Sequence, residues 1–255
     1  MPKTTKKLKQ IYRFLEKNHS WNEAFQLAEY KKALTSCLTA EQRLIALMHM
    51  VVHSQSSPPL TLLAPFWEHM HRAPWQERRP TLLELTTYIE SLSPRRSASV
   101  GPWDRLFRSL ESVKGWGPKT AALFVKCVVK LHRSDLSDLY FLQDPQTACA
   151  IESNDRLYLP VDKVILKIFD SINVTDLGDK LHPINDSLHA AGYGVEETLV
   201  WDDLWFWGFF TQNSSAAGRV FGWNAGRFWG QLSSPKSDIV TIQKKCQQFL
   251  GMLQE

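Results

Sequence analysis

The sequence predicts an all-α fold, and three observations support this. Apolar residues recur with the 3.6-residue period of amphipathic helices along most of the chain, whereas the alternating pattern of strands is scarce. Helix-start signals precede the periodic segments: residues 39–53 open with Thr39 and Gln42 in a capping-box arrangement, and 80–92 open with a proline. The 255 residues are 44% hydrophobic and 22% charged, which is typical of a globular chain long enough to bury a core.

The first predicted helices lie between residues 39 and 132. The segment 39–53 is apolar on nearly all sides and should be buried, and 80–92 is amphipathic. The next helix places an apolar stripe on one face of 103–113, formed by Trp103, Leu106, Phe107, Leu110 and Val113. In 119–132 the alanines and valines should point inward, with Lys126 and Lys130 outward.

The second half of the chain begins with a different composition. Residues 133–159 are polar and irregular, and we interpret them as a long connection or insertion. A helix then starts at Asp162, where Val161 and Leu166 are spaced as a hydrophobic staple. One helix is expected through 196–210, with Trp201, Leu204, Trp205 and Gly208 on one face, and an amphipathic helix over 238–250 closes the chain.

Composition limits the class of protein. The cysteines are far apart and include no CxxC pair, so a zinc site, a redox pair and a disulfide framework are not expected. No apolar run reaches about 18 residues and the N-terminus lacks a signal-peptide core, so we expect a cytoplasmic protein, with access to the nucleoid in a prokaryote. The net charge of +4 does not by itself require a nucleic-acid partner. Basic residues cluster in Met1–Ser20 and at Arg95 and Arg96, which is also typical of solvated surface charge.

The stretch "VKGWGPKTA", residues 113–121, predicts a tight turn between two helices. Gly115 and Gly117 permit positive φ and the close approach of another backbone, and Pro118 suits the first position of a helix. The N–H groups of Gly117 and Lys119 would then form an anion site that fits a nucleic-acid phosphate without base preference. A plain helical hairpin with a glycine turn is the alternative.

The stretch "VKGWGPKTAALF" resembles the helix-hairpin-helix motif of the DNA glycosylase superfamily that includes endonuclease III and the 8-oxoguanine glycosylases. Val113 stands at the motif's leucine position and Lys114 replaces its usual proline. The matching residues are Gly115, Trp116, Gly117, Lys119, Thr120 and Ala121.

Three further segments are similar to this family and follow its order. They are "VVHSQSS" with Gln55, "LPVDKVILKIF" with Asp162, and "DDLWFWGFF" with Gly208. The resemblance covers about residues 38–130 and 157–212.

The resemblance implies that Lys119 and Asp162 are catalytic. A lysine on the first turn of a helix lies in a positive local field, which favours the neutral amine that attacks the sugar C1′ and forms a Schiff base. In the family, lysine at this position marks enzymes that also cleave the strand by β-elimination. Asp162 would stabilise the positive charge that develops on the sugar. The alternatives are a phosphate-binding or solvated lysine, and an aspartate that only caps its helix.

The resemblance also assigns binding residues. Gln55 would fill the gap left by a flipped nucleotide, or else it is a polar residue at a helix end. Phosphate contacts would come from Lys114, Gly115, Gly117 and Thr120, helped by Lys126, Arg95 and Arg96. Most of the aromatic cluster 201–210 should be core, but Trp205 or Phe209 would hold the base. The Gly- and Trp-rich segment 221–232 could line the site. A monovalent cation would bind the backbone carbonyls of Glu111, Val113 and Trp116.

The resemblance implies two helical domains with the active site in the cleft between them. The first is a helical barrel over 38–132 with the hairpin, and the second joins 1–37 to 158–255. Lys119 and Asp162 are about twice as far apart in sequence as in the family, so 133–157 is treated as an insertion or long connection. Near the C-terminus only Cys246 is present, so no iron–sulfur cluster is expected and no cofactor is required.

The resulting expectation is a monomeric glycosylase with lyase activity that acts on double-stranded DNA and has no membrane partner. An oxidised purine such as 8-oxoguanine is the favoured target, and a modified pyrimidine stays open. Two alternatives come from other classes: a non-catalytic DNA-binding protein that keeps the hairpin as a phosphate anchor, and a helical interaction protein in which the glycine turn is incidental.

Overall fold

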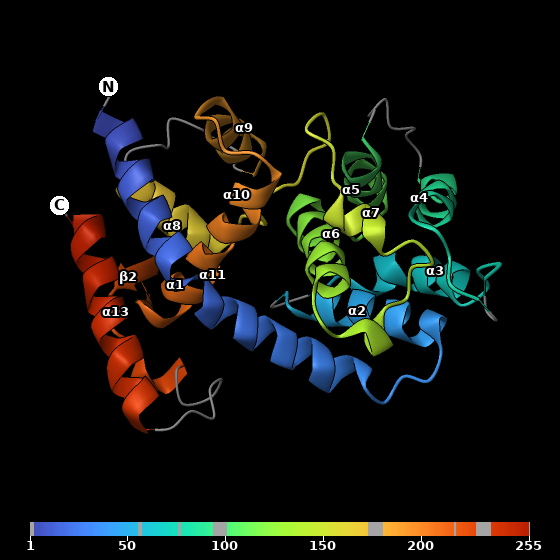
Figure 1. Ribbon diagram of the computed structural model, residues 1–255, viewed down its shortest axis with the longest axis horizontal. Coiled ribbons are helices and arrows are strands. Elements are labelled where there is room, and N and C mark those ends of the chain that lie inside the picture. The colour runs from blue at the N-terminus through green and yellow to red at the C-terminus, as the bar shows by residue number, and fades with distance from the viewer. Residues whose placement is uncertain are drawn as a thin grey trace. The chain divides into compact units, whose positions relative to one another are not determined.

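The computed structural model of the protein describes residues 3–55, 58–75, 78–93, 101–172, 181–216, 218–227 and 236–254 (Figure 1). Helices make up most of this part of the chain, and its β-structure is a short two-stranded hairpin. The all-α prediction is therefore confirmed. None of the described helices is long and apolar enough to cross a membrane.

The chain divides into two compact units. Unit 1 is formed by Met1–Phe25 and Val161–Glu255, and unit 2 by Gln26–Pro160. The long helix α1 (Lys3–Leu34) contributes residues to both. This division differs from the boundaries expected from the sequence, because residues 26–37 and 133–160 both belong to unit 2.

Unit 2 is built around two helices joined by the glycine turn. Helix α5 (Pro102–Ser112) packs against α4 (Leu82–Ser91) and α6 (Pro118–Arg133), and α6 packs against α2 (Ala40–His53) and α7 (Gln146–Cys149). The apolar stripe predicted on α5 is buried along its whole length, and the Thr39/Gln42 capping box is formed at the start of α2. The elements of unit 2 after α1 are α2 (Ala40–His53), α3 (Leu60–Met70), α4 (Leu82–Ser91), α5 (Pro102–Ser112), α6 (Pro118–Arg133), the 3-10 turn η1 (Ser137–Leu139) and α7 (Gln146–Cys149).

The outward orientation predicted for Lys126 and Lys130 is wrong. Their side chains are only 6% and 9% exposed, because α6 is covered on this face as well as on its alanine and valine face. The Lys126 ammonium donates a hydrogen bond to Oε1 of Gln26 in α1 at 3.3 Å. Neither lysine is therefore placed at the surface to bind a phosphate.

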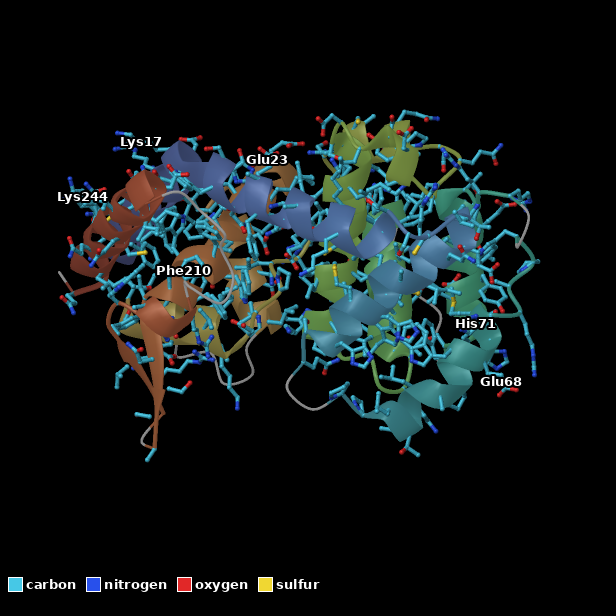
Figure 2. All side chains as sticks on the ribbon, turned by 90° about the horizontal axis from the view of Figure 1, so that it is seen from below. Lys17, Glu23, Glu68, His71, Phe210 and Lys244 are labelled. Carbon is cyan, nitrogen blue, oxygen red and sulfur yellow. The ribbon has the colours of Figure 1, made fainter. Side chains whose placement is uncertain are left out.

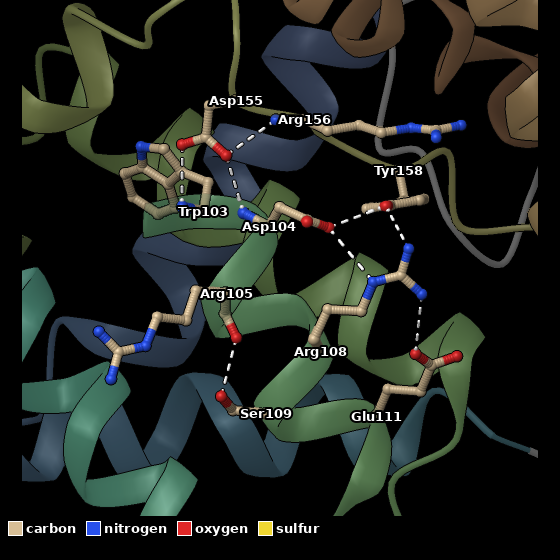
Figure 3. Close-up of polar contacts among 9 residues, drawn as sticks. All are labelled: Trp103, Asp104, Arg105, Arg108, Ser109, Glu111, Asp155, Arg156 and Tyr158. Carbon is tan, nitrogen blue, oxygen red and sulfur yellow. Dashed lines mark hydrogen bonds and ion pairs between the residues drawn. The ribbon is translucent and has the colours of Figure 1, made fainter. Parts of the chain in front are cut away.

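Residues 133–160 are tied to the helices of unit 2 by hydrogen bonds at several points. The imidazole Nε2 of His132 accepts the N–H groups of Phe141 and Leu142, at 3.3 and 3.1 Å. Near the end of the segment, the buried Asp155 carboxylate accepts the N–H groups of Trp103 and Asp104 and so caps α5 (Figure 3). The segment is thus part of the unit's packing.

Unit 1 places helix α8 (Lys163–Ser171) and a β-hairpin next to the aromatic helix α11 (Asp203–Phe210). The antiparallel strands β1 (Gln212–Ser215) and β2 (Gly218–Phe221) follow α11 and pair Gln212 with Phe221. The single helix expected over 196–210 is divided at Asp202, where the Trp205 N–H bonds to the Asp202 carbonyl three residues earlier. The elements of unit 1 after α1 are α8 (Lys163–Ser171), α9 (Leu181–Ala190), α10 (Val195–Trp201), α11 (Asp203–Phe210), β1 (Gln212–Ser215), β2 (Gly218–Phe221) and α13 (Lys236–Gln254).

Aromatic rings fill the core of unit 1. Phe14 of α1 contacts Trp207 of α11 edge-on at 5.2 Å and Phe249 of α13 at 5.4 Å. Figure 2 shows Phe210 among the packed side chains, whereas Lys17 and Lys244 lie at the surface. The first half of α1, α11 and α13 therefore share one core.

Candidate functional site

The glycine turn, residues 113–118, needs its glycines for two different reasons. Gly115 has φ of 92°, and a Cβ there would lie 2.8 Å from Cγ of Leu63 in α3. Gly117 has φ of 22°, and a Cβ there would meet nothing within 4 Å. Trp116 between them is fully buried and contacts Phe66 and Phe124 edge-on. The turn is therefore anchored by Trp116 and packed at Gly115, while Gly117 lies open to an approaching ligand.

The N-terminus of α6 follows the turn directly. Its N-cap residue is Gly117, which has no side chain, and no side chain caps the first turn. Pro118 occupies the first helical position, as the sequence predicts. An uncapped helix N-terminus with an exposed glycine in front of it fits an anion.

The Lys119 side chain reaches the end of α2. Its Nζ donates to Oγ of Ser54 at 3.4 Å, and the Ser54 hydroxyl donates its own proton to the Val51 carbonyl at 2.7 Å. The only hydroxyl proton of Ser54 is thus used by the backbone, which leaves its oxygen as an acceptor for the lysine. Sequence reasoning missed Ser54, although it lies next to Gln55 in the segment that resembles the family.

Gln55 is close to this pair in sequence and turns its amide inward. Its backbone N–H bonds to the Val52 carbonyl at 3.2 Å, and its Nε2 is buried with no hydrogen-bond partner among the described residues. A buried amide without a partner is unfavourable by roughly 1–3 kcal/mol. The side chain therefore gains hydrogen bonds if it swings outward.

The other residues predicted for DNA contact in unit 2 differ in exposure. Lys114 is exposed, whereas Thr120 is only 3% exposed, so its hydroxyl is not presented at the surface. Arg95 and Arg96 lie outside the described residues. Of the carbonyls predicted to bind a cation, that of Val113 accepts the Trp116 N–H at 3.1 Å.

A cavity of about 460 Å³ lies beside the glycine turn, and the sequence does not predict it. Its lining is mainly apolar and comes from α3, the end of α4 and the turn; it includes Leu62, Pro65, Phe66, Leu92, Val113 and Lys114. Neither Lys119 nor Ser54 lines it, so it is separate from the surroundings of the lysine.

Asp162 lies in unit 1 and caps α8. Its Oδ1 accepts the N–H groups of Val164 and Ile165 at 2.8 and 2.9 Å, and its Oδ2 makes no hydrogen bond with the described residues. The capping role is therefore present, and it fixes the half-buried carboxylate at the start of the helix with one oxygen unused.

The aromatic pair Trp205 and Phe209 lies on α11. Both are partly exposed, whereas every other residue of 201–210 is buried. Their rings stack with centroids 5.0 Å apart, and the guanidinium of Arg227 lies 4.5 Å from the Phe209 centroid. Burial and the neighbouring Arg219 lower the pKa of Arg227, while Asp162 acts in the opposite direction. Through Arg227, the aromatic pair and Asp162 thus belong to one region of unit 1.

Gly208 permits the close packing of α11 on α8. A Cβ at this position would lie 2.5 Å from Cγ1 of Val164 and 2.9 Å from Cδ1 of Ile168. Val164 is also the residue whose N–H is capped by Asp162. The glycine therefore sets the distance between the aromatic helix and the helix that carries the carboxylate.

The predicted site residues fall into two groups. Lys119 and Gln55 belong to unit 2, together with the glycine turn, whereas Asp162, Trp205 and Phe209 belong to unit 1. Among the described residues, no group of three or more His, Cys, Asp or Glu side chains is placed to hold a metal ion.

Comparison with known proteins finds no similarity that carries a function. No protein-family model matches the chain, and no curated protein or solved structure matches it significantly. A functional assignment must therefore rest on the chemistry of these residues.

Proposed function

We propose that this protein is a DNA glycosylase that removes a damaged or modified base and then cleaves the strand through a lysine Schiff base. The observation that carries the proposal is the place of Lys119. It lies in the first turn of α6 directly after the glycine turn, and its amine is held by Ser54. An amine at a helix N-terminus combines an anion-binding backbone with a nucleophile.

DNA binding would begin at the glycine turn. The exposed Gly117 lets a phosphate approach the start of α6, where the helix dipole favours negative charge, and the exposed Lys114 adds a positive charge beside it. Such contacts position the duplex without reading its sequence. Gln55 would then fill the space left by the extruded nucleotide, where its amide finds the partners it lacks.

The chemical step assigned to Lys119 needs a neutral amine. The amine attacks C1′, the bond from C1′ to the base breaks, and the base leaves with the electron pair and takes up a proton. The amine then loses a proton as the sugar ring opens, which gives the imine. Removal of a C2′ proton from the imine expels the 3′ phosphate and cleaves the strand.

Asp162 would act on the sugar from unit 1. Because Oδ1 is held by two backbone N–H groups, the carboxylate has a fixed orientation, and Oδ2 is the atom left to stabilise positive charge near C1′. Trp205 and Phe209 would stack on the extruded base. An oxidised purine such as 8-oxoguanine is the favoured base on family resemblance, with a modified pyrimidine as the alternative.

Borohydride trapping tests the proposal. Labelled duplexes that carry an abasic site, 8-oxoguanine, thymine glycol or uracil are incubated with the wild type, Lys119→Gln and Lys244→Gln. Lys244 is an exposed lysine of α13 and serves as the matched control (Figure 2). We expect a covalent adduct with the wild type and Lys244→Gln and none with Lys119→Gln, and the duplex that traps best identifies the substrate class.

Two other outcomes would replace the proposal. Binding to duplex DNA that weakens strongly with salt, with no adduct on any substrate and no base release, indicates a non-catalytic DNA-binding protein. No binding to DNA at moderate salt indicates a helical interaction protein in which the turn is incidental.

A further inference from the structure

The segment after the β-hairpin is fastened to the end of α11. Asn224 donates its backbone N–H to the Phe210 carbonyl at 2.8 Å and its side-chain amide to the Gln212 carbonyl at 2.9 Å. The Asn224 Oδ1 in turn accepts the Arg227 N–H at 3.2 Å. These bonds fix the backbone of Arg227 relative to α11, so its guanidinium is placed over the Phe209 ring by the fold.

A second arginine acts on the same place. Arg219 lies in β2, opposite Ser214 of β1, and its Nη1 is buried with no hydrogen-bond partner among the described residues. Its charge is close enough to Arg227 to lower the pKa of that guanidinium, in addition to the effect of burial, and the Asp162 carboxylate acts in the opposite direction. In the part of the chain that the structure describes, neither arginine forms an ion pair with a carboxylate within 4.0 Å.

Arg219 and Arg227 repel each other, and Arg219 also has a buried donor without a partner among the described residues. This arrangement destabilises the fold. A guanidinium nitrogen without a partner is unfavourable when it is buried, and repulsion adds to this cost. An anion that binds here offsets both the repulsion and the unsatisfied donor, because a phosphate or carboxylate accepts hydrogen bonds from guanidinium groups in a well-defined geometry.

The stacked rings of Trp205 and Phe209 indicate a second property of the ligand, which is a planar ring. Trp205 stacks on Phe209 and also lies near Phe25 of α1, with the centroids of Trp205 and Phe25 6.2 Å apart. The aromatic pair is thus supported from α1, and it offers a partly exposed apolar surface at the edge of the charged site. Such surfaces bind planar heterocycles by stacking.

We propose that Trp205, Phe209, Arg219 and Arg227 form a binding site in unit 1 for a planar heterocycle that carries an anionic group. The ring lies against Trp205 and Phe209, and the anion accepts hydrogen bonds from the guanidinium groups of Arg219 and Arg227. The anion is either the phosphate of the bound nucleotide or an acidic substituent on the base. This inference rests on the proposed function for the identity of the ring as a nucleobase.

Calorimetric titration of the full chain tests the site. The ligands are deoxyguanosine and thymidine, their 5′-monophosphates, and 5-carboxy-2′-deoxyuridine, which carries its charge on the base. We expect at least one anionic ligand to bind about tenfold more tightly than its neutral counterpart, the effect of one or two charge-assisted hydrogen bonds. Tighter binding of the monophosphates assigns the anion to the phosphate, and tighter binding of the carboxylated nucleoside assigns it to the base.

Three variants locate the effect. Arg227→Gln and Arg219→Gln should each remove the preference for the charged ligand, while Phe209→Leu should weaken charged and neutral ligands alike. Arg72→Gln is the matched control, because Arg72 is an exposed arginine of unit 2 paired only with Glu68 on the surface. Circular dichroism on each variant ensures that only folded protein is compared.

The proposal is overturned if no charged ligand binds more tightly than its neutral counterpart, or if both arginine variants keep the preference. The titration needs neither Lys119 nor a lesion. A failure of trapping at Lys119 would therefore leave this site standing, and a failure of the titration would leave the lyase proposal standing.

Discussion

The buried carboxylate of Asp203 lies 2.8 Å from Nδ1 of His19 and accepts a hydrogen bond from Asn22 at 2.7 Å. Asp203 begins α11 and is fully buried, while His19 and Asn22 come from α1. A carboxylate in such a position destabilises the fold unless its oxygens are paired. These contacts therefore hold α1 against the start of the aromatic helix in unit 1.

Removal of the histidine should weaken unit 1. We expect His19→Ala to lower the free energy of unfolding by about 2 kcal/mol, because a buried charge loses a hydrogen-bond partner. Urea unfolding measures the change, with Lys17→Ala as the control, since Lys17 is exposed on the same helix. Equal transition midpoints for the two variants would show that the pair contributes nothing.

The imidazole of His132 predicts a pH dependence. It accepts two N–H groups at Nε2 and contacts the Val128 carbonyl at Nδ1, which requires the neutral ring. Burial lowers the pKa of His132 to about 4, from an ordinary value of 6.5. Above pH 6.5 both folded and unfolded chains hold the ring neutral, and between 6.5 and 4 only the unfolded chain takes up the proton.

Stability should therefore fall as the pH drops from 6.5 to 4, by up to about 3 kcal/mol from this residue. Urea unfolding at intervals over this range measures the effect. His132→Gln should flatten the curve, whereas His71→Gln, at an exposed position, should leave it unchanged. A wild-type curve that parallels the His132→Gln curve would contradict the assignment.

Local signals in the sequence are sufficient to predict several of the helices, among them α2 and α5. The Thr39 capping box and the apolar stripe on α5 depend only on residues within a few turns, and both are present. The burial of Lys126 was not predictable, because its partner Gln26 lies far away in sequence on α1. The break at Asp202 was missed for the same reason, since the neighbouring Asp203 pairs with His19.

Contacts between residues far apart in sequence also limit how much of the candidate sites the sequence predicts. The sequence predicts a base-binding role for Trp205 or Phe209 in a dense aromatic run, and within 201–210 these are the two residues that the structure leaves partly exposed. Ser54 and Arg227 were not selected, because a single polar residue has no pattern of its own and gains a role only from the group placed beside it.

The contact of Asp155 with α5 predicts a structural role for the 133–160 segment. Asp155→Ala should lower the free energy of unfolding by about 2 kcal/mol, because the Trp103 and Asp104 N–H groups lose their acceptor. Asp135→Ala is the comparison within the same segment, and it should change stability by less than about 0.5 kcal/mol. Thermal unfolding compares the two, and similar losses would mean that the cap is not the reason.

Substitution of the two glycines of the turn should have different effects: Gly115→Ala should mainly lower stability, and Gly117→Ala should mainly weaken DNA binding. Gly115→Ala combines positive φ with a Cβ 2.8 Å from Leu63, so we expect a loss of about 2–3 kcal/mol in the free energy of unfolding. Gly117→Ala meets no neighbour and should lose only about 1 kcal/mol to backbone strain.

The added methyl group at Gly117 stands where a phosphate would approach α6. Gly117→Ala should therefore weaken duplex binding about tenfold while the protein stays folded, because the loss of one charge-assisted hydrogen bond lowers the affinity by about this factor. Gly192→Ala is the matched control, because Gly192 also has positive φ and open space but belongs to unit 1 and not to the turn. Gel-shift titration measures the affinity. If Gly117→Ala binds DNA as tightly as Gly192→Ala, the start of α6 is not a phosphate site.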